Sequence, residues 1–528
     1  MNTARERYNK LSSGRNQFLT TAVECSELTL PYLIDNDLSS HPNHKRIKTP
    51  WQSVGAKCVV TLAAKLMLAL LPPQTTFFKL QVRDDKLGED IPPEIRSELA
   101  LSFSKMERMV MEFIAASSDR VVIHQALKHL IVGGNALIFM GKDGLKNFPL
   151  NRYVVNRDGN GNVLEIVTKE LISRKVLDFE LPEPDPSTVV DETGSNGDDV
   201  EVYTCVKLDE KSGRWVWYQE VDGLIIPGTR STAPKNASPW LVLRFNTVDG
   251  EDYGRGRVEE FVGDLRSLEG LSQALVEGSA AAAKVVFLVS PSSTTKPATL
   301  AKSGNGAIIQ GRPEDVAVVQ VGKTADFSTA ANMAQQIERR LSDAFLLMNV
   351  RNAERVTAEE VRLTQLELEQ QLGGIFSLLT VEFLVPYLNR TLLVLQRRNE
   401  IPKLPKDLVR PSIVAGVNAL GRGQDRESLT QFIGTIAQTL GPEALMQYIN
   451  PSEAIKRLAA AQGIDVLNLV KTEQQLQQEA AQAQQAQAQQ ALIGQAGQLA
   501  SSPMIDPSKN ATLANSIDND EVDLPPQE

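Results

Sequence analysis

The sequence predicts an α+β protein that is predominantly helical. Apolar residues recur at helical spacing over most of the chain. Between about 141 and 250 that period gives way to short β-branched and aromatic runs divided by turn signals, and a second β-like stretch covers 285–325. The chain has 528 residues, of which 42% are hydrophobic and 23% charged. This is ordinary for a globular protein and long enough for two or more packed regions.

The first 140 residues are predicted to be mostly helical. One apolar helix ends at Pro72-Pro73, and an amphipathic helix covers 94–116. The stretch 124–140 is either an apolar helix or a helix followed by a strand, because Gly133-Gly134 loosens it. The helix before the prolines is indicated by Val54, Cys58, Leu62, Lys65, Leu66 and Ala69.

Hairpins are predicted between about 141 and 250. An exposed acidic loop is expected at Pro182–Asp199. The expected strands are Arg152–Val155, Val163–Thr168, Val200–Lys207, Arg214–Tyr218 and Leu241–Phe245. The turns between them are marked by Asp158-Gly159-Asn160-Gly161, Lys211-Ser212-Gly213 and Asp222-Gly223.

Two helices with a β-like insert between them are expected after Asp249. The apolar stripe of the first is Val258, Phe261, Leu265, Leu268, Leu271 and Leu275. The insert contains the β-like runs Val285–Val289, Ala307–Gln310 and Val316–Val321. The second helix, Ala330–Met348, carries Met333, Ile337, Leu341 and Phe345 on one face.

A break at Asn349–Val356 precedes the strongest helical signal in the chain. Thr357 and Glu360 have the spacing of a capping box. Gly373-Gly374 and Pro386 should bend this helix. Its apolar stripe is Val361, Thr364, Leu368, Leu372, Phe376 and Leu379.

The C-terminal part of the chain carries weaker signals. A small helical region is expected at 424–470. Thr472–Ala500 is rich in Gln and Ala, which favour helix but offer little apolar face. Ser501–Glu528 is polar and acidic and is expected to be disordered.

Charge and cysteine usage limit the possible functions. The formal net charge is -10, so the overall field should repel DNA and leave only local basic contacts. Cys25, Cys58 and Cys205 form no motif and are expected to be free, buried thiols. The polar N-terminus does not resemble a signal peptide.

No membrane-spanning segment is predicted. Val59–Leu71 is too short to cross a bilayer and carries Lys65. Val121–Met140 contains His124, Lys128 and His129. Both are interpreted as buried core segments.

The motifs that could indicate an enzyme are incomplete. Gly322-Lys323-Thr324 resembles the end of a phosphate-binding loop, but Ala317 stands where that loop needs a glycine. The pairs His41/His44 and His124/His129 do not converge as metal ligands would. Glu359/Glu360 fit a helix N-terminus better than an acid–base pair. No catalytic residue, metal site or cofactor is therefore predicted.

Two segments carry a family resemblance. One is Gly250-Glu251-Asp252-Tyr253-Gly254-Arg255-Gly256, and the other is Arg351-Asn352-Ala353-Glu354-Arg355-Val356-Thr357-Ala358-Glu359-Glu360-Val361. With the chain length and the element order, they resemble the portal, or head-to-tail connector, proteins of short-tailed, podovirus-type DNA phages over about 1–470. The resemblance implies a dodecameric ring at one capsid vertex, with wing, stem, clip and crown regions.

The resemblance also implies a division of the chain. The wing would be 1–255, helical over 1–140 and β-rich over 141–250. The later regions would be stem helix 1 at 256–284, the clip at 285–327, stem helix 2 at 328–348, the channel (tunnel) loop at 349–356, a long bent helix and wing return at 357–423, the crown at 424–500 and the acidic tail at 501–528.

Three groups of site residues follow from this division. Arg351, Asn352 and Arg355 would contact phosphates without reading sequence, although Arg355 could instead pair with Glu354 or Glu359. The acidic candidates for lining the channel, or else ordinary solvated helix charges, are Glu259, Glu260, Asp264, Glu269 and Glu277. The candidates for packing between ring subunits are Ala280, Ala281, Ala282, Ala283, Met333, Ile337 and Leu341.

The implied function is a passive conduit for double-stranded DNA, without chemistry of its own. The implied partners are other copies of the chain, major capsid and scaffolding proteins, the terminase large subunit, tail adaptor or nozzle proteins, and internal core or ejection proteins. The implied place is the capsid portal vertex of the virion, after synthesis in the host cytoplasm. The alternatives are a ring-forming virion or secretion channel that carries no DNA and, more remotely, a nucleotide-dependent enzyme using Lys323.

Overall fold

The computed structural model divides into two compact units, Met1–Leu420 and Gly421–Glu528. In the second unit the described residues form one helix, 430–439. The residues described are 3–35, 47–72, 76–82, 93–177, 199–282, 286–292, 296–304, 308–310, 312–319, 324–347, 373–402, 409–413 and 430–439.

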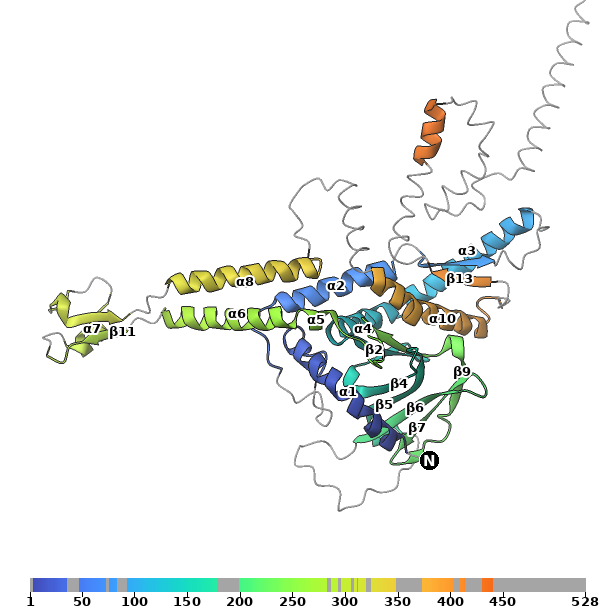
Figure 1. The fold of residues 1–528 in the computed structure, drawn as a ribbon, viewed down its shortest axis with the longest axis horizontal. Coiled ribbons are helices and arrows are strands. Elements are labelled where there is room, and N and C mark those ends of the chain that lie inside the picture. The colour runs from blue at the N-terminus through green and yellow to red at the C-terminus, as the bar shows by residue number, and fades with distance from the viewer. Residues whose placement is uncertain are drawn as a thin grey trace, which may run out of the picture. The chain divides into compact units, whose positions relative to one another are not determined.

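Helices dominate the N-terminal third of the first unit (Figure 1). They are α1 (Ala4–Glu27), α2 (Val54–Leu70), α3 (Pro93–Ala116) and α4 (Asp119–Gly133). The helices predicted before Pro72 and at 94–116 are thus confirmed. In α1 the Thr3 side chain accepts the Glu6 N–H, and the Glu6 carboxylate accepts the Thr3 N–H, which completes a capping box.

The chain after α4 follows the helix-then-strand alternative. Gly134 adopts a left-handed φ of 71° and ends α4. Strand β2 (Asn135–Met140) begins at the next residue and is buried over its first four positions.

All strand pairs in the described residues are antiparallel. The largest sheet has the order β4-β5-β6-β7-β8, with β9 also paired to β7. Its strands are β4 (Tyr153–Arg157), β5 (Val163–Ser173), β6 (Asp199–Asp209), β7 (Arg214–Val221), β8 (Leu224–Ile225) and β9 (Ser231–Pro234). The hairpins predicted for this region and their three turns are confirmed.

Three smaller sheets complete the β structure. A three-stranded sheet has the order β10-β2-β3, and two-stranded sheets pair β1 with β13 and β11 with β12. The remaining strands are β1 (Phe78–Val82), β3 (Leu145–Phe148), β10 (Trp240–Arg244), β11 (Val286–Val289), β12 (Val316–Val319) and β13 (Val409–Ile413). Short 3-10 helices cover Leu150–Arg152, Arg174–Val176, Lys235–Ala237 and Pro313–Asp315.

Helix 373–397 contains a π-helical turn, Thr380–Leu384, which passes into α10 (Val385–Arg397). By length and composition this helix could cross a membrane. Its side chains Leu379, Phe383 and Leu388 instead belong to the main hydrophobic cluster, which is the arrangement of a core helix.

The mixed helical and antiparallel fold agrees with the predicted class, although several elements differ from expectation. Strand β1 lies inside the region predicted to be mostly helical. The run expected at Ala307–Gln310 is not a strand where it is described, at 308–310, and α7 (Pro297–Lys302) was not predicted. The segment 297–310 is too short and polar for hydrophobic periodicity to distinguish a helix from a loop.

Candidate functional site

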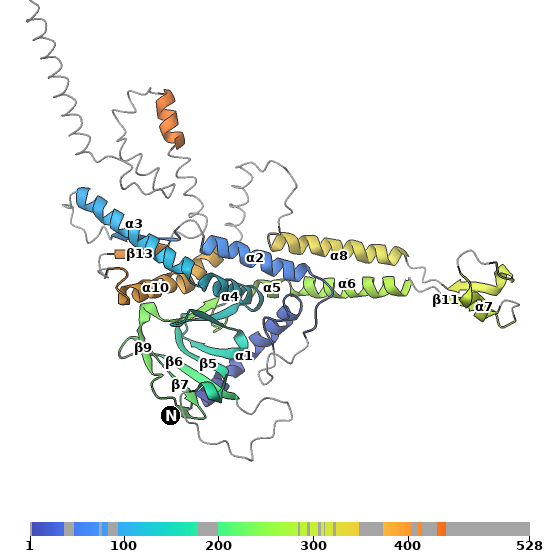
Figure 2. The ribbon, with the colours of Figure 1, turned by 180° about the vertical axis from the view of Figure 1, so that it is seen from behind.

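The helices on either side of the β-containing insert form an antiparallel pair. They are α6 (Val262–Ala282), preceded by the short α5 (Arg257–Glu260), and α8 (Thr324–Ala344). At one end the rings of Phe261 and Phe345 pack edge to face with centroids 5.5 Å apart. At the other end a side chain at Gly278 would collide with the ring of Phe327. The pair is seen from both sides in Figures 1 and 2.

The two helices have different bounds from those predicted. The first is interrupted at Phe261 between α5 and α6. The second begins at Thr324, before the expected Ala330, and ends at Ala344 rather than Met348. It ends early because Leu346 has a left-handed φ of 57°, so that the Leu347 N–H donates to the Ser342 carbonyl at 2.7 Å.

The C-terminal end of α8 is held in place by α2. The Lys65 ammonium donates to the Leu346 carbonyl, where an unpaired helix-end carbonyl needs a donor. Burial lowers the pKa of Lys65. Leu341 and Phe345 are buried beside this contact. The residues that follow α8 are therefore held against α2, directly before the predicted loop 349–356.

The candidate ring-packing residues are differently placed. Ile337 and Leu341 are buried within the single chain, whereas the Met333 side chain is 51% exposed. Ala280 and Ala281 are exposed. Ala283 and the side chain of Ala282 lie outside the described residues. Packing between subunits stays a prediction for the exposed positions.

The five acidic candidates all have hydrogen-bond or ion-pair partners within the chain. The partners of Glu259, Glu260 and Asp264 are Arg255 at 2.6 Å, Arg257 at 2.5 Å and Arg340 at 2.8 Å. Glu269 accepts the Trp51 N–H at 2.9 Å, and Glu277 accepts the Gln273 side-chain amide at 2.9 Å. Which of them face a channel stays a prediction.

The segment Gly250–Gly256, which directly precedes α5, packs against the edge strand β4 of the largest sheet. The Tyr253 hydroxyl accepts the Val155 N–H at 3.1 Å, and the Asp252 carboxylate accepts the Arg157 N–H at 3.0 Å. Both donors lie on β4, at the edge of the strand order. Side-chain oxygens therefore accept hydrogen bonds from backbone N–H groups that would otherwise be free to pair with another β-strand.

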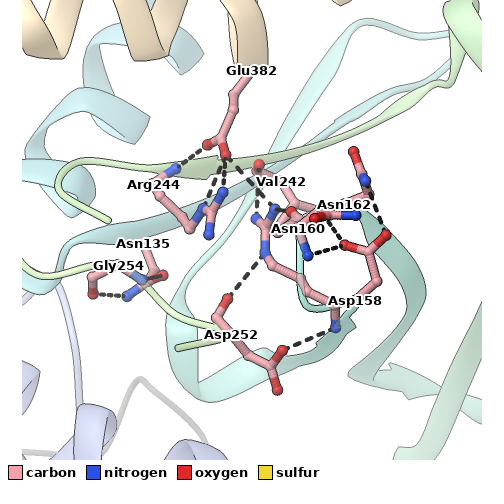
Figure 3. Close-up of polar contacts among 11 residues, drawn as sticks. Asn135, Asp158, Asn160, Asn162, Val242, Arg244, Asp252, Gly254 and Glu382 are labelled. Atoms are coloured by element: carbon pink, nitrogen blue, oxygen red, sulfur yellow. Dashed lines mark hydrogen bonds and ion pairs between the residues drawn. The ribbon is translucent and has the colours of Figure 1, made fainter. Parts of the chain in front are cut away.

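The same segment crosses the start of β2 at very short range. The Asn135 side chain donates to the Gly254 carbonyl and accepts the Gly254 N–H, both at 2.8 Å (Figure 3). A Cβ on Gly134 would lie 2.5 Å from the Gly254 carbonyl oxygen, and one on Gly256 would lie 2.6 Å from the Val132 carbonyl oxygen. Glycines are required at this crossing because no side chain fits between the backbones.

A buried ion-pair network joins this crossing to helix 373–397. Glu382, in the π-helical turn, accepts from the Arg244 guanidinium at 2.6 Å and from the Arg244 N–H at 2.9 Å (Figure 3). Arg157 forms a longer ion pair with Glu382 at 3.7 Å and donates to the Asp252 carbonyl at 3.0 Å. Burial lowers the pKa of Arg157, while the Glu382 carboxylate opposes that shift. One carboxylate thus serves two buried cations.

The histidines and cysteines in the described residues form no cluster. No group of three or more His, Cys, Asp or Glu side chains that could hold a metal occurs there. His129 is buried, which lowers its pKa to about 4 and keeps it neutral. Cys25, Cys58 and Cys205 are free and buried, as predicted. His41, His44, Lys323, Glu359 and Glu360 lie outside the described residues.

Known proteins match nearly the whole chain. The family model for "Bacteriophage head to tail connecting protein" matches residues 1–468. The chain is 39% identical to the portal protein of Escherichia phage T7 over 490 residues, covering 91% of this chain and 90% of the relative. The chain belongs to this family. It is also 40% identical to the portal protein of Enterobacteria phage T3 over 493 residues, which is 91% of each chain.

A solved structure was also matched. The neck of an empty GTA particle aligns with 78% of this chain and 90% of its own, at 13% identity and a TM-score of 0.36. That score is too low to support an argument.

Membership in the head-to-tail connector family confirms the resemblance seen in the sequence. The protein is a structural component of a tailed-phage virion at the head–tail junction, not an enzyme. Residues Arg351, Asn352 and Arg355 lie outside the described residues, and their contact with DNA stays a prediction.

Most residues that contact the segment Gly250–Gly256 and its neighbouring strands were not predicted from the sequence. The segment Gly250–Gly256 was singled out, but its partners Asn135, Arg157 and Glu382 were not. A Gly-Gly-Asn step between an apolar helix and a strand was the available signal for Asn135. Glu382 carried a different signal, as an acidic residue within an otherwise apolar helical stripe.

Proposed function

We propose that this chain assembles into a dodecameric ring at one capsid vertex, through which double-stranded DNA is packaged and later ejected. The observation that carries the proposal is the antiparallel pair α6 and α8. The pair is anchored at one end by Phe345 and Lys65, while residues such as Met333, Ala280 and Ala281 are exposed along its length. Exposed faces on paired helices suit a heterologous contact that closes into a ring.

The charge distribution suits a conduit that does not hold DNA. The chain has a net charge of -10, and phosphates are repelled by such a field. Glu269 and Glu277 on α6 have neutral donors as their described contacts, and of these two Glu277 is exposed whereas Glu269 is half-buried against backbone N–H groups. Glu277 is therefore the first residue we would assign to a channel surface.

The regions of the ring would follow the division made from sequence. The N-terminal helices and the β-rich sheet would form the wing, α6 and α8 the stem, and 285–327 the clip. The clip would dock the terminase large subunit and later the tail adaptor or nozzle proteins. The crown at 424–500 would face the capsid interior and the internal core proteins. Capsid and scaffolding proteins would surround the ring during assembly.

The DNA role is tested at the predicted loop 349–356. The double variant Arg351→Ala/Arg355→Ala should lower the number of packaged genomes or their retention, because two phosphate contacts are lost. The readout is encapsidated DNA per particle, with ring formation followed by electron microscopy. The control is Arg108→Ala/Arg230→Ala, which removes two exposed arginines elsewhere.

Normal packaging by the Arg351→Ala/Arg355→Ala phage would remove the DNA contact from this loop. Intact rings with normal packaging would favour a channel component whose loop does not touch DNA. Lost rings in the double variant alone would assign these arginines to assembly instead.

A further inference from the structure

The segment that precedes α2 is held against α6 and carries an exposed tryptophan. Both carboxylate oxygens of Glu269, on α6, accept the Trp51 N–H, at 2.9 and 3.0 Å, and one of them also accepts the Gln52 N–H at 3.3 Å. The Gln52 side chain donates to the Leu28 carbonyl at 2.7 Å. The Trp51 side chain is nevertheless 47% exposed. A large aromatic side chain on a fixed backbone is well suited to anchor a protein interface.

Trp51 begins an exposed apolar surface that continues along α6. Val276 is seven residues after Glu269, about two turns of helix, so both lie on the same face of α6. The Val276 side chain is 53% exposed, and Ala280, one turn later, is also exposed. The segment with Trp51 runs directly into α2, so this surface lies on the α2 side of the α6–α8 pair. It is called here the Trp51 side and consists of Trp51, Val276 and Ala280.

A second exposed surface lies on the other side of the α6–α8 pair. Helix α2 covers one side, where the Cys58 thiol lies 3.9 Å from the Leu341 carbonyl oxygen. Burial raises the pKa of Cys58 and the charge of Glu338 adds to that rise, so Glu338 lies on the α2 side of α8. Met333 is five residues before Glu338, about 140° around the helix, and therefore lies away from α2.

The surface around Met333 includes small residues of α6. Arg340, seven residues after Met333, forms an ion pair with Asp264 at 2.8 Å, so both helices contribute to this side of the pair. Ser267 is about one turn after Asp264, and Ala274 is about two turns further on. Both of these small residues are exposed. The surface is called here the Met333 side and consists of Ser267, Ala274 and Met333.

We propose that the Trp51 side of one copy packs against the Met333 side of the next copy, with the Trp51 indole seated on Met333. This contact rests on the ring proposed above and gives it a specific anchor. A heterologous ring contact joins two different surfaces of the same subunit type, one on each side of every copy. The two surfaces meet that requirement because they flank the same helix pair.

The composition of the two surfaces suits such a contact. Their neighbouring carboxylates are already occupied, Glu269 by backbone N–H groups and Asp264 by an arginine of α8. The exposed positions of both surfaces are apolar or small, so little charge has to lose water when they meet. Ser267 and Ala274 leave room beside the long Met333 side chain, and a flexible thioether packs favourably on an aromatic ring.

Photo-cross-linking in the full-length protein tests the contact. The probe p-benzoyl-phenylalanine at position 51 keeps an aromatic side chain there and should link to the next copy under ultraviolet light. We expect a ladder of covalent oligomers on a denaturing gel and a linked tryptic peptide 324–339, which contains Met333. The matched control replaces Val121, an exposed apolar residue of α4, with the same probe and should not link to that peptide.

Replacing Trp51 by Ala provides a second readout. This variant should need at least about tenfold more protein for half-maximal ring formation, because every interface loses its anchor. Trp51→Phe should restore most of the assembly, and Val121→Ala should assemble like the parent protein. Circular dichroism checks that each variant is folded.

The outcomes separate the contact from the ring itself. Rings in which position 51 links only within its own chain, or only to other peptides, would overturn the contact and leave the ring standing. Normal assembly of folded Trp51→Ala would overturn it as well. A parent protein that forms no ring under any condition would contradict the proposed function, and this contact with it.

Discussion

Replacing Glu382 by Ala should destabilise the first unit by about 3–5 kcal/mol, because it leaves buried cations without their carboxylate. The side chains of Arg244 and Arg157 are 10% and 3% exposed, so water cannot replace the lost partner. The Arg244 N–H on β10 would also lose its acceptor. Urea unfolding followed by tryptophan fluorescence measures the effect, since Trp240 begins the same strand.

An exposed ion pair provides the control for Glu382. Glu112 pairs with Arg108 on α3, and their side chains are 65% and 72% exposed. Glu112→Ala should change the free energy of unfolding by less than about 0.5 kcal/mol. Equal losses from Glu382→Ala and Glu112→Ala would contradict the argument that one buried carboxylate holds this junction together.

Replacing Gly134 by Ala should be at least as damaging, at about 3 kcal/mol or more. The left-handed backbone at this position costs an L-residue roughly 1–2 kcal/mol. The new Cβ would also lie 2.5 Å from backbone atoms of Gly254 and Arg255, which cannot move like the end of a side chain. We expect fewer folded chains on expression and a lower urea midpoint.

Gly14→Ala is the matched control for Gly134→Ala. Gly14 lies on the exposed side of α1 with nothing within 4 Å of an added Cβ. Alanine favours helix over glycine, so this variant should gain about 0.5–1 kcal/mol. A Gly134→Ala protein as stable as the Gly14→Ala protein would show that the backbone crossing tolerates a side chain.

Local patterns predicted the local structure well. The five strands expected between 141 and 250 occur because β-branched runs and turn signals lie next to each other in sequence, as in the Asp158 turn, where the carboxylate accepts the Asn160 and Asn162 N–H groups. Pairings between distant segments could not be found this way. Strand β1 pairs with β13, more than 300 residues later, and nothing in Phe78–Val82 alone specifies that partner.

The candidate site was predictable in outline but not in its contacts. The two helices were found because each carries an apolar stripe, and both contribute to the main core. The acidic residues on the first helix were chosen by position alone, whereas the pairing of Asp264 with Arg340 depends on how the helices align. Likewise, Lys65 was recognised only as part of a helix, since its acceptor is a backbone carbonyl distant in sequence.

The central claim is that this chain forms a closed ring around a channel. Negative-stain electron microscopy of the purified full-length protein, combined with particle mass measurement, tests it most directly. The account predicts closed rings with a central hole and a mass of about twelve chains, held together through heterologous contacts. A monomer or dimer that persists across salt and protein concentration would contradict it.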